Sequence, residues 1–464
     1  MSPVRRAAAR TFKSLRVRNY RLYFFGQVIS MSGTWMQIVA QGWLVLRLTG
    51  SGVAVGIVTG LQFLPVLVAG AWGGILADRF NKRVLATATQ VAAAVLALAL
   101  GLLTAFGLVQ LWMIYALAFG LGCVTVVDVP ARQSFVMEMV GPEDVTNAVG
   151  LNTTVFTAAR VIGPAIAGIL ISVVGLAPCF FINALSYVAV IASLVAMNGD
   201  ELRRVDRVPR GKGQIREGLS YVWTRPELRS TMLLLAIVGT LAFNFRVLLP
   251  LLARSVFGGG AGLYGTLSAV LGIGTMIGAL LSAARAKPTR AVLVGSALTF
   301  GALMLAAGVA PTLIVEMIVL VPLGAASMTF ITTVNATLQL NSSDAMRGRV
   351  MALYSVLFLG TTPIGSPLVG WLAQAISVRT AFLIPGAATM LGGLAALVAL
   401  RRSKLAAGPS EGLRPGGPEG TPGSHPSVAM PSLGGGSSRP SSPPGPSSAH
   451  PAPVRRVERP RERR

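Results

Sequence analysis

The chain has 464 residues, of which 53% are hydrophobic and only 12% are charged. A soluble domain carries about 25% charged residues, and a bilayer core excludes charge because hydrocarbon cannot solvate it. The composition therefore excludes an ordinary soluble protein and indicates an integral membrane protein. The formal net charge of +24 does not indicate nucleic-acid binding, because the basic residues gather at the ends of hydrophobic segments. There they fix membrane topology and contact anionic lipid of the bilayer.

Twelve hydrophobic segments follow a basic N-terminus (1–21), and a helix needs roughly 20 apolar residues to cross a bilayer. In chain order they are 22–46, 54–77, 84–106, 110–131, 149–174, 177–197, 231–253, 263–284, 291–307, 312–334, 350–374 and 380–400. The sequence thus predicts an all-α membrane protein with twelve transmembrane helices.

The segments divide six and six around a polar linker, 198–230, which predicts an N-terminal six-helix bundle (22–197) and a C-terminal one (231–400). Three residues of the fifth segment recur in the eleventh at a constant offset: Ile162, Gly163 and Gly168 match Ile364, Gly365 and Gly370. Such a match in equivalent segments is typical of a parallel repeat. Within the linker, apolar residues at helical spacing predict a short interfacial helix: Ile215, Leu219, Val222 and Trp223.

Loop charges set the orientation. Basic residues follow the second, fourth, sixth, eighth and tenth segments, whereas the opposite loops hold only Arg47, Arg254 and Arg379. Lys and Arg are enriched on the cytoplasmic side, so both termini are predicted to be cytoplasmic. After residue 400 the composition changes to Gly, Pro and Ser, which predicts a disordered cytoplasmic tail at 401–464. The tail is either a lipid-binding or regulatory arm or a dispensable extension.

A charged motif follows the second segment: Gly74, Asp78, Arg79, Lys82 and Arg83. It resembles the loop signature of the major facilitator superfamily, with Asn81 in place of a glycine. Asn tolerates the left-handed backbone that glycine supplies. The resemblance implies that the aspartate meets a helix start and a nearby arginine, and latches the two halves while the cavity faces outward. The alternative is an ordinary topology loop with an incidental aspartate.

The fifth segment carries a second motif: Gly150, Arg160, Gly163, Pro164 and Gly168. Its spacing resembles a motif of the exporters in this superfamily, although Ala159 and Ala167 replace two glycines. Small residues let helices approach closely and the proline bends the span. Export is therefore favoured, and generic close packing is the alternative.

The resemblance extends from about residue 12 to residue 400 and is strongest toward the bacterial branch that contains enterobactin-type siderophore exporters. Besides the fifth segment, it is carried by 35–37, 43–45, 128–133 and 249–254. It implies a monomeric transporter of the bacterial cytoplasmic membrane that exports a small amphipathic or apolar compound, siderophore or drug-like, in exchange for protons. An importer of the same fold is the first alternative.

An enzyme or a receptor is disfavoured, because both histidines, His425 and His450, lie in the tail. No metal or other cofactor is predicted.

Charged residues within segments are costly unless paired or hydrated, so they are candidates for mechanism. Arg160 lies near the middle of its segment, while Arg246 and Glu316 lie in the outer third of theirs. In the fold that the resemblance implies, the latter two segments line the cavity. The two side chains are either a proton-coupling pair or a fixed structural ion pair.

Asp128 and Arg132 lie close to the cytoplasmic surface, where gating is the favoured role and proton carriage stays open. Gln37, Gln41 and Asn244 are polar residues within spans. They line the cavity or form hydrogen bonds between spans.

Asp78→Asn is predicted to reduce transport sharply while leaving insertion and expression near normal, because the charge stabilises one conformation of the latch. Transport is measured in membranes that contain equal amounts of each protein. A normal rate for the variant would contradict the role of Asp78 as a latch.

Overall fold

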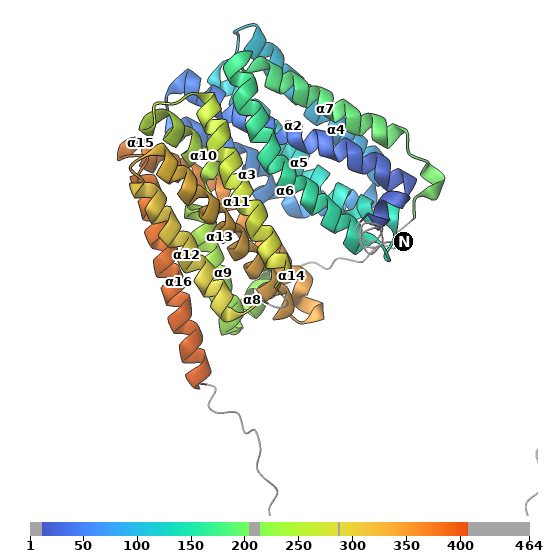
Figure 1. Cartoon of the computed structure of the whole chain (residues 1–464). Coiled ribbons are helices and arrows are strands. Elements are labelled where there is room, and N and C mark those ends of the chain that lie inside the picture. The colour runs from blue at the N-terminus through green and yellow to red at the C-terminus, as the bar shows by residue number, and fades with distance from the viewer. Residues whose placement is uncertain (1–11, 204–213, 286–287, 407–464) are drawn as a thin grey trace, which may run out of the picture. The chain divides into compact units, whose positions relative to one another are not determined.

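A computed structural model of the protein describes residues 12–203, 214–285 and 288–406, and this part of the chain consists of helices joined by short loops (Figure 1). The first half contains η1 (Lys13–Arg16), α2 (Arg18–Thr49), α3 (Gly52–Arg79), α4 (Lys82–Ala105), α5 (Leu111–Val140), α6 (Val145–Val173), α7 (Ala177–Val195) and η2 (Gly199–Glu201). The second half contains α8 (Gln214–Thr224), α9 (Pro226–Leu241), α10 (Phe245–Leu251), η3 (Leu252–Val256), α11 (Ala261–Ala283), α12 (Arg290–Val309), α13 (Leu313–Leu340), α14 (Asp344–Leu359), α15 (Thr362–Ala375) and α16 (Thr380–Ala406). The all-α prediction is confirmed for these residues.

Eleven segments of the described chain are long and apolar enough to cross a membrane. The predicted first span, α2, is not among them, because this 32-residue helix carries many polar side chains. Several of them are buried against neighbouring helices: Asn19, Gln27, Ser30, Gln37 and Gln41. α2 thus belongs to the bundle although its surface is less apolar, and the structure agrees with twelve spans.

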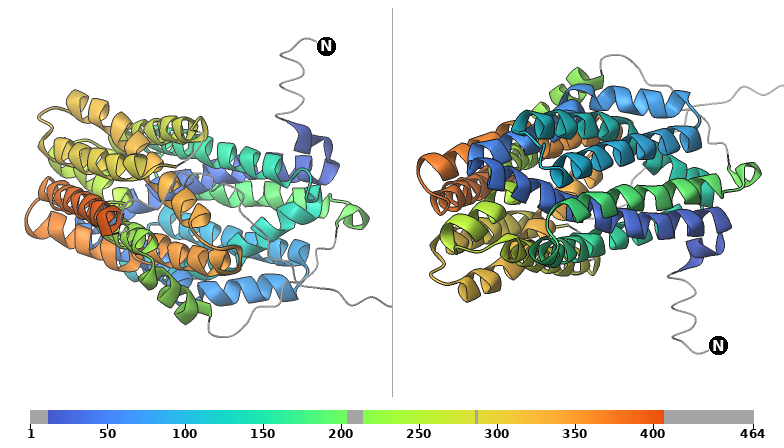
Figure 2. Two further views of the ribbon diagram at one scale, coloured as in Figure 1. Left: turned by 90° about the horizontal axis from the view of Figure 1, so that it is seen from below. Right: turned by 90° about the horizontal axis from the view of Figure 1, so that it is seen from above.

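The helices form two groups that pack by the same scheme, drawn from blue to green and from light green to red in Figures 1 and 2. In the first group α3 packs on α5, α4 on α7 and α2 on α7. In the second group the corresponding pairs are α11 on α13, α12 on α16 and α9 on α16. The shared pairing confirms two six-helix bundles.

Two of the predicted spans are interrupted helices. α9 stops at Leu241 and the helix resumes at Phe245, while α14 stops at Leu359 and α15 starts at Thr362. The predicted spans 231–253 and 350–374 each fall within one segment that is long and apolar enough to cross a membrane, and the breaks lie inside those segments. A helix break inside a membrane frees backbone carbonyls, which must find partners within the protein.

Asn244 supplies those partners at the first break. Its side-chain nitrogen donates hydrogen bonds to the carbonyl oxygens of Thr240 and Leu241, at 2.7 and 3.1 Å. Its side-chain oxygen accepts a hydrogen bond from Ser366 Oγ on α15, at 2.8 Å. One buried side chain therefore satisfies the broken helix and joins α10 to α15.

The predicted linker helix is present as α8. Val222 is buried, whereas Leu219 and Trp223 remain exposed, which suits a helix at a membrane surface. α8 packs on α14, and Glu217 pairs with Arg349 at 2.6 Å. At the other boundary, α16 continues to Ala406, beyond the predicted limit of the bundle at 400. The rest of the predicted tail lies outside the described residues.

Glycines allow the two bundles to approach closely at two places, α6 on α11 and α3 on α15. A Cβ atom on Gly265 of α11 would lie 2.6 Å from Gly168 Cα and 2.6 Å from the carbonyl oxygen of Pro164. A Cβ atom on Gly52 of α3 would lie 2.8 Å from the carbonyl oxygen of Gly370. Because lipid tails are as apolar as side chains, such close packing replaces the hydrophobic effect as the force that holds helices together.

Gly265→Ala is predicted to lower the thermal stability of the purified protein, because the added Cβ forces apart two backbones that cannot bend away cheaply. Overpacking costs about 1–3 kcal/mol, so the melting temperature in detergent should fall measurably. Gly150→Ala is the matched control, since a Cβ there meets nothing within 4 Å. Equal melting temperatures for the two variants would contradict the role of Gly265 at this interface.

Candidate functional site

The helical domain has two ends: the Arg18 end, where α2 begins, and the Gly50 end, where α2 leads into α3. Helices alternate between these ends along the chain. The predicted site residues fall into three groups. One lies toward the Arg18 end, one at mid-depth and one near the Gly50 end.

Asp128 and Arg132 lie one turn apart on α5, in a polar network toward the Arg18 end. Arg132 Nε lies 2.7 Å from Asp128 Oδ2, although its N–H is not directed along that line, so the contact is an ion pair. Asp128 Oδ1 accepts hydrogen bonds from Thr89 Oγ1 at 2.9 Å and Gln90 Nε2 at 3.0 Å, both on α4. Arg132 Nη1 donates to Gln27 Oε1 on α2 at 2.9 Å. The network ties three helices of one bundle together.

The loop between α3 and α4 differs from the expectation for Asn81. Its φ of −62° and ψ of 120° are extended, not left-handed, so the expectation of a left-handed backbone was wrong. Asn81 instead caps α4, because its side-chain oxygen accepts hydrogen bonds from the backbone N–H groups of Arg83 and Val84, at 3.0 and 3.3 Å. Asn is a favoured residue at this capping position.

The basic residues of the same motif contact their own bundle. Lys82 Nζ lies 2.5 Å from Glu138 Oε1 on α5. The Arg83 guanidinium donates to the carbonyl oxygens of Leu194 and Val195, at 2.8 and 2.9 Å. These carbonyls at the end of α7 lack partners within the helix, and a cation is favoured there.

The remainder of the motif lies in the last turns of α3, where Gly74 is buried and Arg79 is exposed. The side chain of Asp78 lies outside the described residues. The latch role of Asp78 stays a prediction.

The three polar candidates take part in packing between helices to different degrees. Gln37 Oε1 accepts a hydrogen bond from Asn183 Nδ2 on α7 at 2.6 Å, and Asn244 bridges to Ser366. Gln41 is buried one turn beyond Gln37 on α2. For Gln37 and Asn244 the structure supports hydrogen bonding between spans.

The glycines of the fifth-segment motif have unequal surroundings. A Cβ on Gly163 would lie 2.6 Å from Trp35 Cβ on α2, and one on Gly168 would lie 3.2 Å from Gly265 Cα on α11. Gly150 has open space around it. The repeated residues of the second half behave alike: a Cβ on Gly365 would meet Thr240 on α9, and one on Gly370 would meet Gly52 on α3. The glycines repeated between the fifth and eleventh segments therefore serve close packing between helices.

At mid-depth, Arg160 of α6 and Arg246 of α10 approach the same tryptophan. The guanidinium carbon of Arg160 lies 5.4 Å from the ring centroid of Trp35, and that of Arg246 lies 5.5 Å from it. Arg246 also lies 5.3 Å from the ring centroid of Phe63 on α3. We name these four residues the arginine cluster. It contains side chains from both bundles.

Neither arginine of the cluster forms a hydrogen bond or an ion pair with another described residue, and both side chains are only partly buried. The two charges act on each other instead. A cation over an aromatic face gains about 0.5–2 kcal/mol. This gain is smaller than the cost of a charge in the membrane, so the guanidinium groups require water or an anion.

Glu316 lies in the first turn of α13, near the Gly50 end, and is fully buried. Neither carboxyl oxygen has a hydrogen-bond partner within the described chain. The charge of Arg379 acts on it. The predicted pairing with Arg246 is not observed, because Arg246 turns toward the aromatic rings of the other bundle.

The Gly50 end joins the two bundles. Ser51 Oγ donates to Gln374 Oε1 at 2.7 Å, and Arg254 of the second bundle donates to the carbonyl oxygen of Leu46. Trp43 stacks on Tyr264, with ring centroids 6.3 Å apart. Between described residues of the two bundles, all hydrogen bonds lie at this end.

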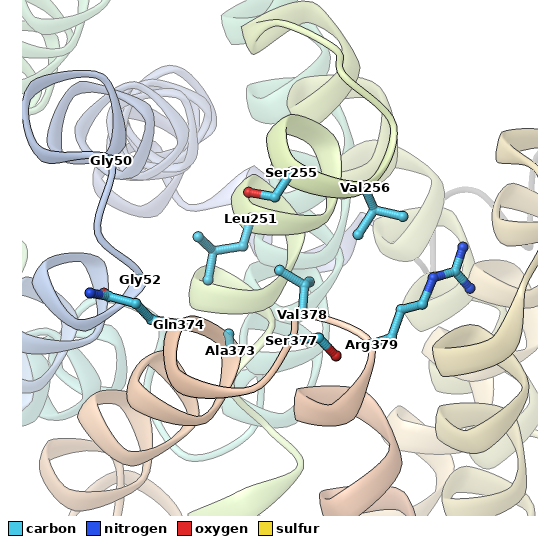
Figure 3. Close-up of a pocket in the computed structure, with 10 residues that line it drawn as sticks. All are labelled: Gly50, Gly52, Leu251, Ser255, Val256, Ala373, Gln374, Ser377, Val378 and Arg379. Atoms are coloured by element: carbon cyan, nitrogen blue, oxygen red, sulfur yellow. The ribbon is translucent and has the colours of Figure 1, made fainter.

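A pocket opens at the same end, between the loop after α2, the end of the α10–η3 segment and the loop after α15 (Figure 3). Leu251 and Ser255 line one side, and Gln374, Ser377 and Arg379 line another. The Trp43–Tyr264 stack lies between this pocket and the arginine cluster. The pocket is therefore a feature of the Gly50 end and is separate from the cluster.

Sequence analysis missed several partners that the structure brings into the site. Trp35 supports the family resemblance but was not assigned a role beside the arginines, and Phe63 was not singled out. Their signal is an aromatic residue at the same depth as an arginine within a facing span. Thr89 and Gln90 could have been found as polar residues at the depth of Asp128.

The comparison with known families agrees with this architecture. Residues 9–416 match the family described as transmembrane secretion effector. The chain belongs to this family of the major facilitator superfamily. Its relatives include the Staphyloferrin A transporter of Staphylococcus aureus, 24% identical over 80% of this chain and 93% of that protein. The multidrug efflux pump Tap of Mycobacterium tuberculosis is 26% identical over 83% of this chain and 94% of that protein.

Solved structures share the fold of this transmembrane secretion effector family member. A bacterial homolog of the human lysosomal transporter Spinster, in an inward-facing and unoccupied conformation, has a TM-score of 0.64 at 15% identity, over 84% of this chain and 97% of that chain. A POT family transporter in complex with 5-aminolevulinic acid has a TM-score of 0.68 at 11% identity, over 83% and 96% of the two chains. Together with the family match and the transporters among its relatives, this makes the protein a membrane transporter of the major facilitator type.

Asp128→Ala is predicted to destabilise this transporter strongly, because it leaves Arg132 without its counter-charge and two α4 donors without an acceptor. Breaking one side of a buried ion pair costs about 3–5 kcal/mol, so the melting temperature in detergent should fall by several degrees. Glu217→Gln is the matched control, since that carboxylate also pairs with an arginine but is 56% exposed. A larger fall for Glu217→Gln than for Asp128→Ala would show that the network is not structural.

Proposed function

We propose that the protein exports a small amphipathic or apolar compound from the bacterial cytoplasm by alternating access, in exchange for protons. The observation that carries the proposal is the one-sided contact between the bundles. Hydrogen bonds and the Trp43–Tyr264 stack join them at the Gly50 end. The arginine cluster lies below that closure, with side chains from both bundles. This arrangement suits a transporter that opens its binding site to one side at a time.

In this proposal the Arg18 end faces the cytoplasm. Basic side chains are abundant there, as in the loop with Lys82 and Arg83, whereas the Gly50 end carries few. The bias toward Lys and Arg on the cytoplasmic side supports that orientation. The conformation described above is then closed to the outside.

Export, and not import, is supported by the relatives. The matching family is described as transmembrane secretion effector, and one relative is described as a multidrug efflux pump. The Staphyloferrin A transporter supports a siderophore as one substrate class. Similar folds serve many solutes, so the direction has to be measured.

Glu316 is the residue that we propose to carry the proton. Its buried carboxyl group has no hydrogen-bond partner among the described residues. An ionised carboxylate in that setting costs several kcal/mol, so the proposal assigns it a proton in this conformation. In an exchange for protons, Glu316 would bind its proton from the outside while the Gly50 end is open, and would release it toward the cytoplasm from the inward-facing conformation as substrate binds. In this proposal Glu316 carries the proton without Arg246, in place of the Arg246–Glu316 coupling pair that the sequence suggested.

The assay uses inverted membrane vesicles, whose cytoplasmic face is outward, and two amphipathic dyes, the cation ethidium and the anion carboxyfluorescein. We expect uptake of at least one dye when the vesicle interior is acidic, and loss of uptake when the gradient is collapsed. Glu316→Gln should abolish uphill uptake but leave downhill exchange, because Gln resembles the protonated carboxyl and cannot release a proton.

Glu143→Gln is the control, since Glu143 is exposed in a loop, and it should transport normally. Undiminished uphill uptake by Glu316→Gln would exclude Glu316 as the carrier. Uptake that occurs only in vesicles of the opposite orientation would point to the importer.

A further inference from the structure

We propose that the arginine cluster binds the anionic group of the transported compound, so that the substrate is an amphipathic carboxylate or a similar organic anion. This inference rests on the proposed function, since it names the substrate class of the same site. Its first basis is geometry. Both guanidinium groups lie about 5.5 Å from the centroid of one ring, so the two charges are no more than about 11 Å apart.

The second basis is charge. Arginine stays protonated in proteins, so the cluster carries two positive charges that repel each other. Like charges this close within a membrane-spanning bundle are costly unless water or an anion compensates them. An anion placed between the two guanidinium groups would relieve the repulsion and fill their empty donor positions.

The third basis is the absence of a protein counter-ion in the described chain. Asp128 is engaged by Arg132, Thr89 and Gln90. Glu316 is fully buried near the Gly50 end and interacts with the charge of Arg379. Several other described acids form ion pairs near the Arg18 end, as Glu138 does with Lys82. None of them forms an ion pair with Arg160 or Arg246.

The fourth basis is the apolar surface beside the charges. Phe156 lies one turn before Arg160 on α6, its ring meets that of Trp35 edge-on at 5.7 Å, and its side chain is 46% exposed. Trp35 and Phe63 complete an aromatic wall next to the guanidinium groups. A planar apolar body with an acidic group fits such a site better than a compact inorganic anion, because rings stack on rings while the acid meets the arginines.

The position of the cluster also explains how a bound anion would act on conformation. Arg160 belongs to the first bundle and Arg246 to the second. Unoccupied, the two charges push the bundles apart at this depth; bound to one anion, they draw the bundles together. A ligand that binds one conformation better shifts the equilibrium toward it.

The test measures binding to the purified full-length protein in detergent. Carboxyfluorescein is the anionic probe and ethidium the cationic one, each titrated against tryptophan fluorescence. We expect carboxyfluorescein to bind, and Arg160→Gln and Arg246→Gln each to weaken its binding at least tenfold. Arg160→Lys should lose less, because it keeps the charge but not the forked donor geometry.

Arg225→Gln is the matched control. This arginine also lies over an aromatic ring, that of Tyr221 at 4.4 Å, but outside the bundles, so its removal should leave binding unchanged. Melting temperatures of all variants separate loss of binding from loss of folding. If Arg160→Gln unfolds, Arg160→Lys and Arg246→Gln still decide the matter.

Four outcomes overturn the inference: no binding of carboxyfluorescein, binding of ethidium alone, equal affinity of the wild type and both Gln variants, and equal loss in Arg225→Gln. None of these bears on transport itself, which the vesicle assay measures separately. Conversely, binding of carboxyfluorescein that depends on the arginines, without transport of either dye, would support the anion site and contradict the proposed function.

Discussion

The structure depends on one constraint: inside a bilayer every charge and every free backbone group must find a partner or water. The protein meets it in three ways. Asp128 and Arg132 neutralise each other within one bundle. Asn244 satisfies the carbonyls freed by a broken helix. Arg160 and Arg246 contact aromatic rings but form no hydrogen bond or ion pair in the described chain, so water or a bound anion has to complete their solvation.

The same constraint separates rigid contacts from movable ones. Within the first bundle, polar networks join α2, α4 and α5 at fixed distances, and such networks resist sliding. Between the bundles, glycine backbones touch through α6 and α11 and through α3 and α15. Contacts between smooth backbones carry few directional bonds, so two bodies can tilt against each other there without leaving a polar group unpaired.

The fold could be predicted from the sequence because the length of each hydrophobic segment shows whether it can cross the membrane, and the loop charges indicate its orientation. α2 was predicted from the length of its apolar stretch, and its polar residues then proved to face other helices. The interruption before Phe245 could not be predicted, because nothing in a run of apolar residues marks where a side chain such as Asn244 will replace a backbone bond. The left-handed backbone expected at Asn81 failed for a related reason: the same residue type also caps helices.

The site was predictable in its members but not in its pairings. Arg160, Arg246 and Glu316 stand out because charge is rare in spans. Which of them come into contact depends on the rotation of each helix about its own axis. A small rotation decides whether an arginine faces an acidic side chain or an aromatic ring. Arg246 was expected to meet Glu316 and meets Trp35 and Phe63 instead.

The bond between Asn244 and Ser366 bears on the speed of opening at the Gly50 end. α10 and α15 are short segments that begin at helix breaks and are tied to each other by that bond. Hinges of this kind concentrate the change of backbone angles in a few residues. When a short segment rotates about a hinge, only the contacts of that segment change. When a whole six-helix bundle rotates, its entire lipid-facing surface moves through the bilayer. α15 and the segment after α10 carry Gln374 and Arg254, so their bonds to the first bundle can break by a local hinge motion, whereas the Trp43–Tyr264 stack separates only when α11 moves as well.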